Sequence, residues 1–386
     1  MGKQVKTPRF YVDMPTFLHA TGQLGWDLSE KGGAELLYMN PSNPFMRFED
    51  SDSTLFLSGT SGNTPKTAFP MNFCALLNHN FASDSNYLKI VGYHGFDDAN
   101  SINFANEWVN PTQILNSNFT ADGENNYIDP EYNGTTIWSF NTIDKYWRSF
   151  LISAPNGDYD DSVSHQLGSL VVGKYWDAPN SPDLNLTMSR RFDGIKKQKT
   201  IGGKTLANIY YDGPTEWTMN HPSDGTYKYP PFELDFSQTY SSDPIMQENQ
   251  FNQSAKSGLG RKGLRSWKLT FSYISEDDMW TAYESSSRAP FEYTEDGEIN
   301  AITDSAIPTD NGVEVSYANN PMLSDDSFNF VWNCTLGGTL PFIFQPDNTN
   351  NNPDQFSICN FRGNSLSVTQ VAHNTYKLSI TIDEVA

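Results

Sequence analysis

Short apolar segments, each closed by glycine, proline, asparagine or aspartate, follow one another along this chain and restrict it to short elements of structure. The segments are rich in aromatic and β-branched residues, as in Tyr146–Ile152 and Arg265–Tyr273. Residues of these types favour strands, whereas Gly, Pro, Asn and Asp favour turns. Aromatic residues make up 14% of the chain and charged residues only 18%, which is unlike a helical protein. The sequence therefore predicts an all-β fold.

The spacing of the segments also indicates the kind of β-protein. Evenly spaced short strands with turn signals are typical of a β-sandwich or jelly roll. In the first half of the chain we expect strands at 73–77, 87–93, 136–140, 146–152 and 167–175. In the second half we expect strands at 205–211 and 265–273, followed by an antiparallel meander of strands at 328–336, 340–344, 356–361, 365–371 and 376–382.

Two local patterns in the second half are specific enough to predict side-chain placement. Residues 265–273 alternate strictly, which puts Trp267, Leu269, Phe271 and Tyr273 on one face of a strand. Ser275, with Asp278 three residues later, is an N-cap candidate for a short helix.

A length of 386 residues suits two domains. We expect an extended N-terminal arm at 1–65, a jelly-roll β-sandwich at 66–189, and a second β-domain at 190–386 that carries a loop insertion at about 290–326. The predicted fold is thus two β-sandwich or jelly-roll-like domains with an extended arm and one short helix. In assemblies, arms of this kind often lie across a neighbouring subunit.

The net charge of −21 and the pI near 4.5 make the surface acidic. Such a surface repels nucleic-acid phosphates and anionic membranes. It either serves solubility or faces a partner with a basic surface. The sequence has no apolar run of the length that a membrane helix needs and no secretory signal pattern. We therefore expect a chain made in a cytoplasm, with no nucleic-acid partner and no membrane insertion.

The sequence lacks the specific motifs of the common enzyme classes, although its 46 carboxylates mean that residue type alone does not exclude a glycosidase pair. The six histidines match no metal-ligand spacing, and neither a Gly-x-Ser-x-Gly elbow nor a phosphate-binding loop occurs. We predict no enzyme activity, no metal and no cofactor. Asp158–Asp161 resembles a calcium-binding turn but lacks EF-hand spacing, so a solvated turn is the competing interpretation. Cys74, Cys334 and Cys359 are predicted to be buried free thiols, with a Cys334–Cys359 bridge as the alternative.

Basic residues gather in two places on this acidic chain. Ten of the 25 lie at 190–204 and 261–268. The clusters balance nearby acids, contact nucleic acid, or form a basic face that meets the acidic surface of a neighbouring copy. We favour the last, and the residues predicted at subunit contacts are Arg190, Arg191, Lys196, Lys197, Arg261, Lys262 and Arg265.

Aromatic-rich sandwiches also bind sugars, because flat rings stack on pyranose faces. Trp108 and Trp138 lie in the first predicted sandwich and are the candidates for glycan stacking. Core packing is the competing interpretation for both.

Several segments resemble a known group of proteins. Leu76–Phe81, Lys145–Phe150 and Leu167–Gly173 are similar to a galactose-binding-like jelly-roll module in tail proteins of tailed bacteriophages, and Phe192–Lys196 with Thr200–Lys204 resembles the segment that comes after this module in those proteins. Gly337–Asp347 and Ile380–Val385 are similar to tail proteins of marine phages. The resemblance covers roughly residues 72–386.

The resemblance implies a virion structural protein, assembled in the host cytoplasm, at or near the tail tip. The expected role is a distal-tail or baseplate-hub subunit that forms a homo-oligomeric ring and contacts other tail proteins. The alternative from a different class is a glycan-binding attachment module, and a secreted glycoside hydrolase ranks third.

Overall fold

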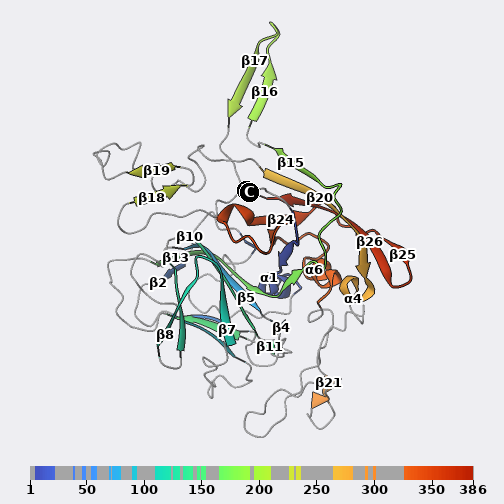
Figure 1. The fold of residues 1–386 in the computed structure, drawn as a ribbon. Helices are drawn as coiled ribbons and strands as arrows, with labels where there is room; N and C mark the ends of the chain where they lie inside the picture. Colours follow the sequence, from blue (N-terminus) through green and yellow to red (C-terminus); the bar gives the residue numbers. More distant parts are fainter. Residues whose placement is uncertain are drawn as a thin grey trace.

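The computed structural model confirms the all-β prediction. Strands hold 49% of the described residues, with three α-helices among them (Figure 1). The structure describes residues 5–21, 38–39, 46–48, 54–58, 69–70, 72–79, 89–93, 109–122, 125–130, 134–141, 146–147, 149–153, 165–191, 195–209, 226–229, 232–235, 264–280, 292–293, 299–300 and 326–385. The Asp158–Asp161 run and nearly all of the 290–326 insertion lie outside these ranges.

The largest unit is an eight-stranded antiparallel sheet. Its order is β14-β1-β23-β24-β26-β20-β15, and β25 pairs with β26 beside β24. The strands are β1 (Arg9–Tyr11), β14 (Tyr175–Asp177), β15 (Thr187–Arg191), β20 (Leu264–Ser275), β23 (Phe342–Gln345), β24 (Ser357–Phe361), β25 (Val368–Ala372) and β26 (Thr375–Glu384). This sheet draws strands from all three segments into which we divided the sequence.

A five-stranded sheet packs beside it, in the order β2-β13-β5-β10-β7. Its strands are β2 (Met46–Phe48), β5 (Phe73–His79), β7 (Val109–Leu115), β10 (Gly134–Asn141) and β13 (His165–Gly173). Alternate residues of β5 fall into two different core clusters, with Cys74 and Leu76 in one and Phe73, Ala75 and Leu77 in the other. Because residues 73–77 of β5 are buried on both faces, they are apolar throughout rather than alternating with polar residues.

The remaining described strands form small antiparallel pairs and one three-stranded sheet, β3-β12-β6. The strands are β3 (Thr54–Ser58), β4 (Phe69–Pro70), β6 (Lys89–Tyr93), β8 (Asn118–Asp122), β9 (Asn125–Asp129), β11 (Tyr146–Trp147), β12 (Ser149–Ser153), β16 (Ile195–Lys199), β17 (Thr205–Ile209), β18 (Thr226–Tyr229), β19 (Phe232–Asp235), β21 (Glu292–Tyr293) and β22 (Ile299–Asn300). The pairs are β4 with β11, β8 with β9, β16 with β17, β18 with β19, and β21 with β22.

The N-terminal segment 5–21 is packed into the body of the protein and differs in this from the extended arm that we expected. β1 pairs with β14 on one edge and β23 on the other. Phe10 and Tyr11 have no exposed surface. The helix α1 (Met14–Ala20) follows directly and buries Met14, Phe17 and Leu18. Three residues are too few to show a strand period, so the tertiary pairing that buries this segment left no readable pattern in the sequence.

The strand β20 keeps the predicted alternation up to Phe271 and then departs from it. Trp267, Leu269 and Phe271 are buried, whereas Tyr273 is 75% exposed and Ile274 is buried in its place. The register with β26 shifts between Phe271 and Ile274. A β-bulge inserts one extra residue and so moves the following side chains to the opposite faces.

The predicted short helix is present as α4 (Glu276–Met279), and the Ser275 side chain accepts a hydrogen bond from the backbone N–H of Asp278. The segment 328–336, which we expected to be a strand, contains the helix α6 (Phe328–Cys334) instead. Its aromatic and β-branched residues favour a strand locally, but packing of four of its side chains in the main core cluster overrides that preference. A 3₁₀ turn, η5 (Pro353–Gln355), completes the described helical elements.

The C-terminal strands are present but are not a simple meander. β24 and β25 both pair with β26, through Phe361↔Ile382 and Val368↔Leu378 respectively. Gly338 makes the turn before β23 with a φ of 86°. A Cβ added there would lie 2.6 Å from the Cβ of Phe361, so only glycine fits this close approach.

Aromatic packing fills the core, in which the rings of Phe342 and Phe361 lie 4.6 Å apart. The prediction for the cysteines is confirmed, since Cys74, Cys334 and Cys359 are all free and buried. Burial raises the pKa of each of these thiols.

Two buried titratable groups have pKa values displaced in opposite senses. Burial raises the pKa of Asp13 from 3.8 to about 7, although a hydrogen bond from Thr16 Oγ1 at 2.5 Å opposes the shift. Burial lowers the pKa of His79 from 6.5 to about 3, and His79 Nε2 lies 2.7 Å from Thr136 Oγ1. As the pH falls from about 6.5 to about 4, Asp13 therefore adds stability while His79 removes it.

We predict that Asp13→Asn makes the protein less stable in mild acid relative to neutral pH. The carboxyl binds its proton more tightly in the folded state, so its contribution is largest below about pH 4 and is lost as pH rises to about 7. Without it, the His79 effect stands alone, on the order of 1.4 kcal/mol per pH unit. Urea unfolding from about pH 4 to about pH 8 measures this, with the exposed Asp277→Asn as control. Identical profiles for wild type and Asp13→Asn would contradict it.

We predict the opposite slope for His79→Gln, which keeps a hydrogen-bonding group next to Thr136 but cannot take up a proton. The unfolded wild-type chain protonates His79 below its ordinary pKa while the folded chain does not. Removing that difference leaves the Asp13 effect, so the variant should gain about 2 kcal/mol between about pH 6.5 and pH 5. The same unfolding series measures it, and a loss of stability in acid would argue against the assignment.

Candidate functional site

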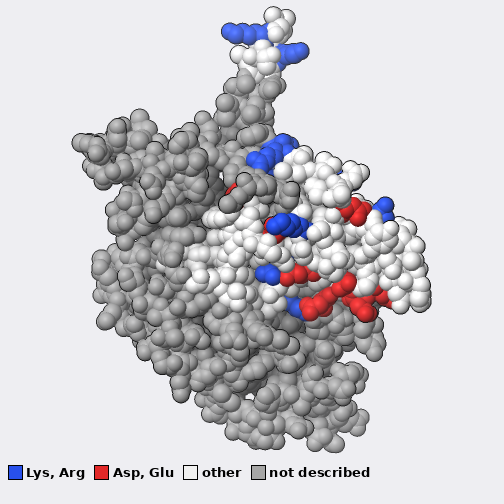
Figure 2. Space-filling model, in the orientation of Figure 1, with Lys and Arg blue, Asp and Glu red and all other residues white. Residues whose placement is uncertain are grey.

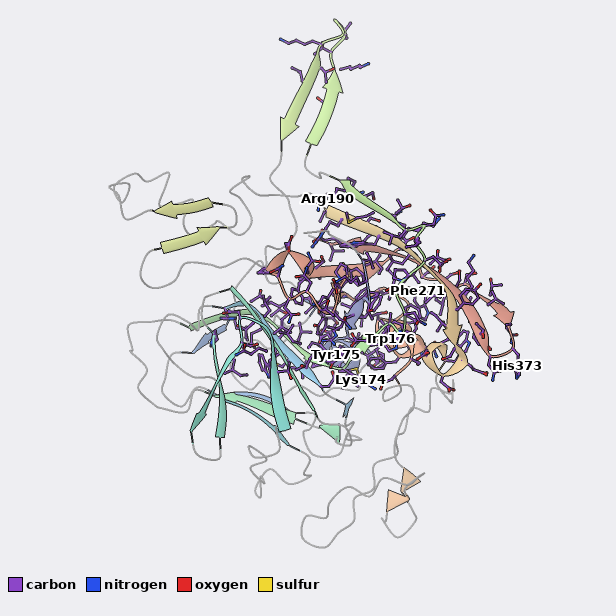
Figure 3. The ribbon with its side chains drawn as sticks, in the orientation of Figure 1. Lys174, Tyr175, Trp176, Arg190, Phe271 and His373 are labelled. Carbon is purple, nitrogen blue, oxygen red and sulfur yellow. The ribbon has the colours of Figure 1, made fainter. Side chains whose placement is uncertain are left out.

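The strand β15 forms an outer edge of the eight-stranded sheet. It pairs with β20 on its inner side, through Thr187↔Lys268 to Arg191↔Leu264. Within the described part of the chain no strand pairs with its outer side. All five of its residues are exposed. Arg190 lies at this rim, away from the aromatic packing around Trp176 (Figure 3). The predicted contact residues Arg190 and Arg191 are thus both on the surface.

The hairpin of β16 and β17 begins four residues after β15 and projects from the body (Figure 1). Its strands pair from Ile195↔Ile209 to Lys199↔Thr205. A turn closes it, in which Thr200 N–H donates to Lys204 O at 2.8 Å and Gly203 adopts a φ of 80°. Neither strand pairs with any other described strand. Among the described strands, the hairpin therefore stands apart from the larger sheets.

The hairpin is basic throughout. Residues 195–209 contain four lysines and no acidic residue, in a chain of net charge −21. Lys199 and Lys204 are exposed, and Figure 2 shows basic side chains at the tip. Lys196 and Lys197 lie on β16, opposite Asn208 and Ala207. The structure does not describe the side chains of these two lysines.

Apolar side chains accompany the lysines. Ile201 at the turn is fully exposed, and Leu206 on β17 is 50% exposed. Next to the hairpin, Met188 on β15 is 40% exposed. None of these three residues stood out in the sequence. The Gly202-Gly203 pair between two strand-like segments is the signal that could have revealed an exposed hairpin turn.

Arg265, predicted at a subunit contact, is instead mostly buried, and its guanidinium is used within the chain. Its ion pair with Glu384 joins Nη2 and Oε1 at 2.8 Å, and the two side chains are 12% and 2% exposed. It also donates to the backbone carbonyls of Asp354 and Phe356 and to Ser357 Oγ. The remaining predicted contacts, Arg261 and Lys262, lie outside the described residues.

Trp138, predicted as a candidate for glycan stacking, is buried with no exposed surface. It is part of the main core cluster through β10. A ring without accessible area cannot stack on a sugar, and core packing is therefore the correct interpretation. Trp108 lies outside the described residues.

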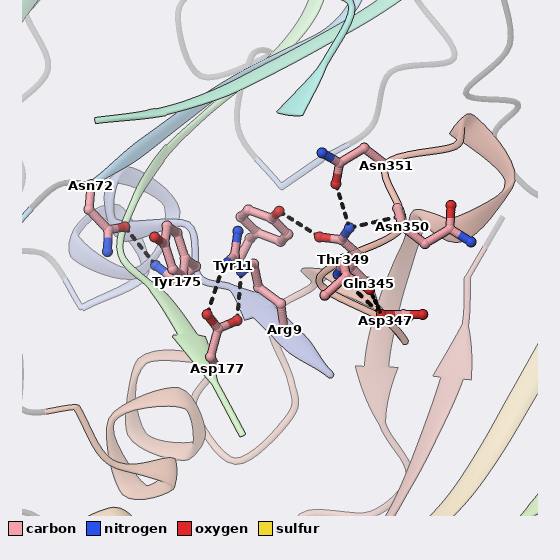
Figure 4. A network of polar contacts seen from close by, with 10 residues as sticks. All are labelled: Arg9, Tyr11, Asn72, Tyr175, Asp177, Gln345, Asp347, Thr349, Asn350 and Asn351. Atoms are coloured by element: carbon pink, nitrogen blue, oxygen red, sulfur yellow. Dashed lines mark hydrogen bonds and ion pairs between the residues drawn. The ribbon is translucent and has the colours of Figure 1, made fainter. Parts of the chain in front are cut away.

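A network of polar contacts fastens β1 and its neighbours (Figure 4). The Arg9 guanidinium donates to both carboxylate oxygens of Asp177, at 2.6 and 2.7 Å, and lies 3.9 Å from the centre of the Tyr175 ring. Burial alone would lower the pKa of Arg9, but the bonds with Asp177 raise it above its ordinary value. Tyr11 Oη donates to Gln345 Oε1 at 2.8 Å. These bonds hold β1 in position against β14 and β23.

The described residues offer no group of three or more His, Cys, Asp or Glu side chains that could hold a metal ion. Among them there is also no helix long and apolar enough to cross a membrane. Within the described part of the chain, the edge strand β15 and the hairpin β16–β17 combine exposure, basic charge and a projecting shape.

No protein-family model, no curated protein and no solved structure matches this chain. Function is therefore inferred from the geometry and from the sequence resemblance of residues 72–386.

We predict that Arg265→Met destabilises the fold by about 3–5 kcal/mol, because it leaves the Glu384 carboxylate buried without its partner. Arg265→Met combined with Glu384→Leu should recover much of that loss. The control Arg190→Met, on the exposed edge strand, should change stability by less than about 0.5 kcal/mol. Urea unfolding measures all three. Equal losses of stability for Arg265→Met and Arg190→Met would contradict the prediction, because the buried ion pair would then contribute no more than an exposed arginine.

Proposed function

We propose that this chain is a non-enzymatic structural subunit of a bacteriophage tail, and that copies of it associate into a ring through the projecting hairpin β16–β17. The ring would sit at the tail tip as a distal-tail or baseplate-hub component, in contact with other tail proteins. The resemblance of residues 72–386 supports the tail assignment. The observation that carries the assembly role is the projecting hairpin, with four lysines, no acid and an exposed isoleucine at its turn.

The exposure of the hairpin favours a partner on energetic grounds. A two-stranded hairpin by itself is marginally stable in water. Ile201 is fully exposed and Leu206 is 50% exposed, so both leave apolar surface in contact with water. Burying a side chain of this size contributes about 1.5–3 kcal/mol. A partner that covers both residues would therefore stabilise the hairpin and hold it in one position.

The charge distribution favours a second copy as that partner. The hairpin holds four of the 25 basic residues, so the rest of the chain has 21 basic residues against 46 acidic ones and a net charge of −25. A basic projection on one copy is thus attracted to the acidic body of the next, which steers association and sets orientation. Contacts between two different surfaces of the same protein close into rings when the rotation between subunits permits.

The glycan-binding alternative has no support among the described residues. Trp138 is buried, and Trp108, the other candidate, lies outside them.

We predict that the purified chain forms a discrete ring-sized oligomer, and that reversing the hairpin charges abolishes it. The variant replaces Lys196, Lys197, Lys199 and Lys204 with Glu and Ile201 with Asp. The matched control is Lys377→Glu, since Lys377 is exposed on β26 far along the sequence from the hairpin. Light scattering after size exclusion gives the mass of each species, at low and at high salt.

The expected result is an oligomer for the wild type and the control, a monomer for the hairpin variant, and weaker association at high salt. Circular dichroism and thermal melting check that the variant remains folded. A wild type that stays monomeric at every concentration, or a folded hairpin variant that still assembles, would refute the proposal.

A further inference from the structure

The main strand path of the eight-stranded sheet ends at β14 on one side and at β15 on the other, while β25 branches off beside β26. The two ends of this path differ. At β14 the edge is short and closed, because the backbone N–H of Tyr175 donates to Asn72 Oδ1 at 2.9 Å. At β15 the edge is five residues long, and every one of those residues is exposed. Proteins ordinarily protect long edge strands, since unpaired backbone groups are a template for pairing with another chain. β15 contains neither proline nor a described bulge.

The register shows which backbone groups point outward. The Arg265 N–H donates to Glu384 Oε2 at 2.8 Å, so on β20 this residue faces β26. Residues alternate in direction along an antiparallel strand, and Ser266 and Lys268 therefore face β15. Their partners Ser189 and Thr187 face back toward β20. Met188 and Arg190 consequently direct their N–H and C=O groups away from the sheet.

The side chains at this edge specify what kind of strand would fit. One row of paired residues runs across β15, β20, β26 and β24. In it, Met188 pairs with Trp267, Trp267 with Ile382, and Ile382 with Phe361. The last three are buried, whereas Met188 is 40% exposed. The row of apolar side chains thus continues to the rim of the sheet. An apolar residue of an added strand, placed opposite Met188, would extend this row by one position and bury the exposed part of Met188.

The charges specify the neighbouring positions of that strand. Arg190 lies opposite Arg265, whose charge is already paired with Glu384. Among the described residues, no carboxylate forms an ion pair with Arg190. Self-pairing of β15 from two copies would add two further arginines from the partner and no acid, and like charges facing one another across strands are destabilising. An added strand that places a carboxylate beside Arg190 would avoid this repulsion between arginines and would form an ion pair with Arg190.

We propose that the outer edge of β15 accepts an acidic extended segment of a partner chain, which adds to the eight-stranded sheet as a ninth strand. The main-chain groups of Met188 and Arg190 supply the hydrogen bonds, Met188 contacts an apolar residue, and Arg190 pairs with a carboxylate. The proposal rests on the geometry of the edge and would hold whether or not the hairpin drives ring formation.

The test uses two fluorescent seven-residue peptides, one of alternating valine and glutamate and one of alternating valine and lysine. Fluorescence anisotropy measures their binding to the full chain, at a protein concentration where light scattering shows a single species. The acidic peptide is expected to bind at least about tenfold more tightly, the ratio that corresponds to one good charge-assisted contact. Arg190→Glu is expected to reverse the preference.

Met188→Pro is the decisive variant. Proline has no backbone N–H, and the N–H of Met188 points away from β20. The substitution should therefore leave the sheet intact yet block strand addition. Binding of the acidic peptide should fall by at least about tenfold, with an unchanged melting temperature. The matched variant Ser189→Pro removes an N–H that faces β20 and is expected to lower the melting temperature, which checks the assigned directions.

Three outcomes would overturn the proposal. These are no binding of the acidic peptide, equal binding of the two peptides, and binding that Met188→Pro leaves unchanged. A dimer of the chain alone that Met188→Pro abolishes would replace the acidic partner with a second copy. Because the readout is peptide binding, its failure is distinguishable from a failure of ring formation, which light scattering reports separately.

Discussion

The pairing of β1 on both of its edges is the interaction on which the rest of the structure depends. β14, on one side of β1, continues the chain of β13 after the single residue Lys174, and β13 belongs to the five-stranded sheet. β23, on the other side, begins the C-terminal half of the large sheet. Three N-terminal residues therefore join the first half of the chain to the last. Arg9, Tyr11 and their polar partners fix that junction in a single register.

The aromatic core follows from this junction. Phe10 of β1 lies within 5.7 Å of the rings of Trp176, Phe342 and Phe344, which come from β14 and β23. A core made of residues this distant in sequence forms only when the strands have paired. The large sheet then grows through β24, β26 and β20 to β15, where described strand pairing ends. The open edge and the projecting hairpin both lie at this last strand.

The candidate site was partly visible in the sequence. The basic cluster at 190–204 stood out against an acidic chain, and the structure places its described members on an exposed edge and an exposed hairpin. Because Arg265 is four residues from Arg261, the sequence placed it in the second basic cluster, at 261–268. Sequence spacing could not show that Glu384, 119 residues away, binds its guanidinium. The sequence likewise placed Trp138 in a strand, but it could not show whether this side chain lies in the core or on the surface.

The sequence by itself determined the class of fold, because turn residues interrupt the chain too often for long helices and the segments between them favour strands. It also determined local features that depend on near neighbours, such as the Ser275 cap. Only the tertiary structure decided that residues 328–334 form a helix, that the bulge in β20 exposes Tyr273, and that residues 10–18 are buried. Each of these depends on packing between distant segments, which outweighs local preferences of a few tenths of a kcal/mol to about 1 kcal/mol per residue. The direction of each backbone group at β15, and hence the edge it offers, is decided in the same way by its register with β20.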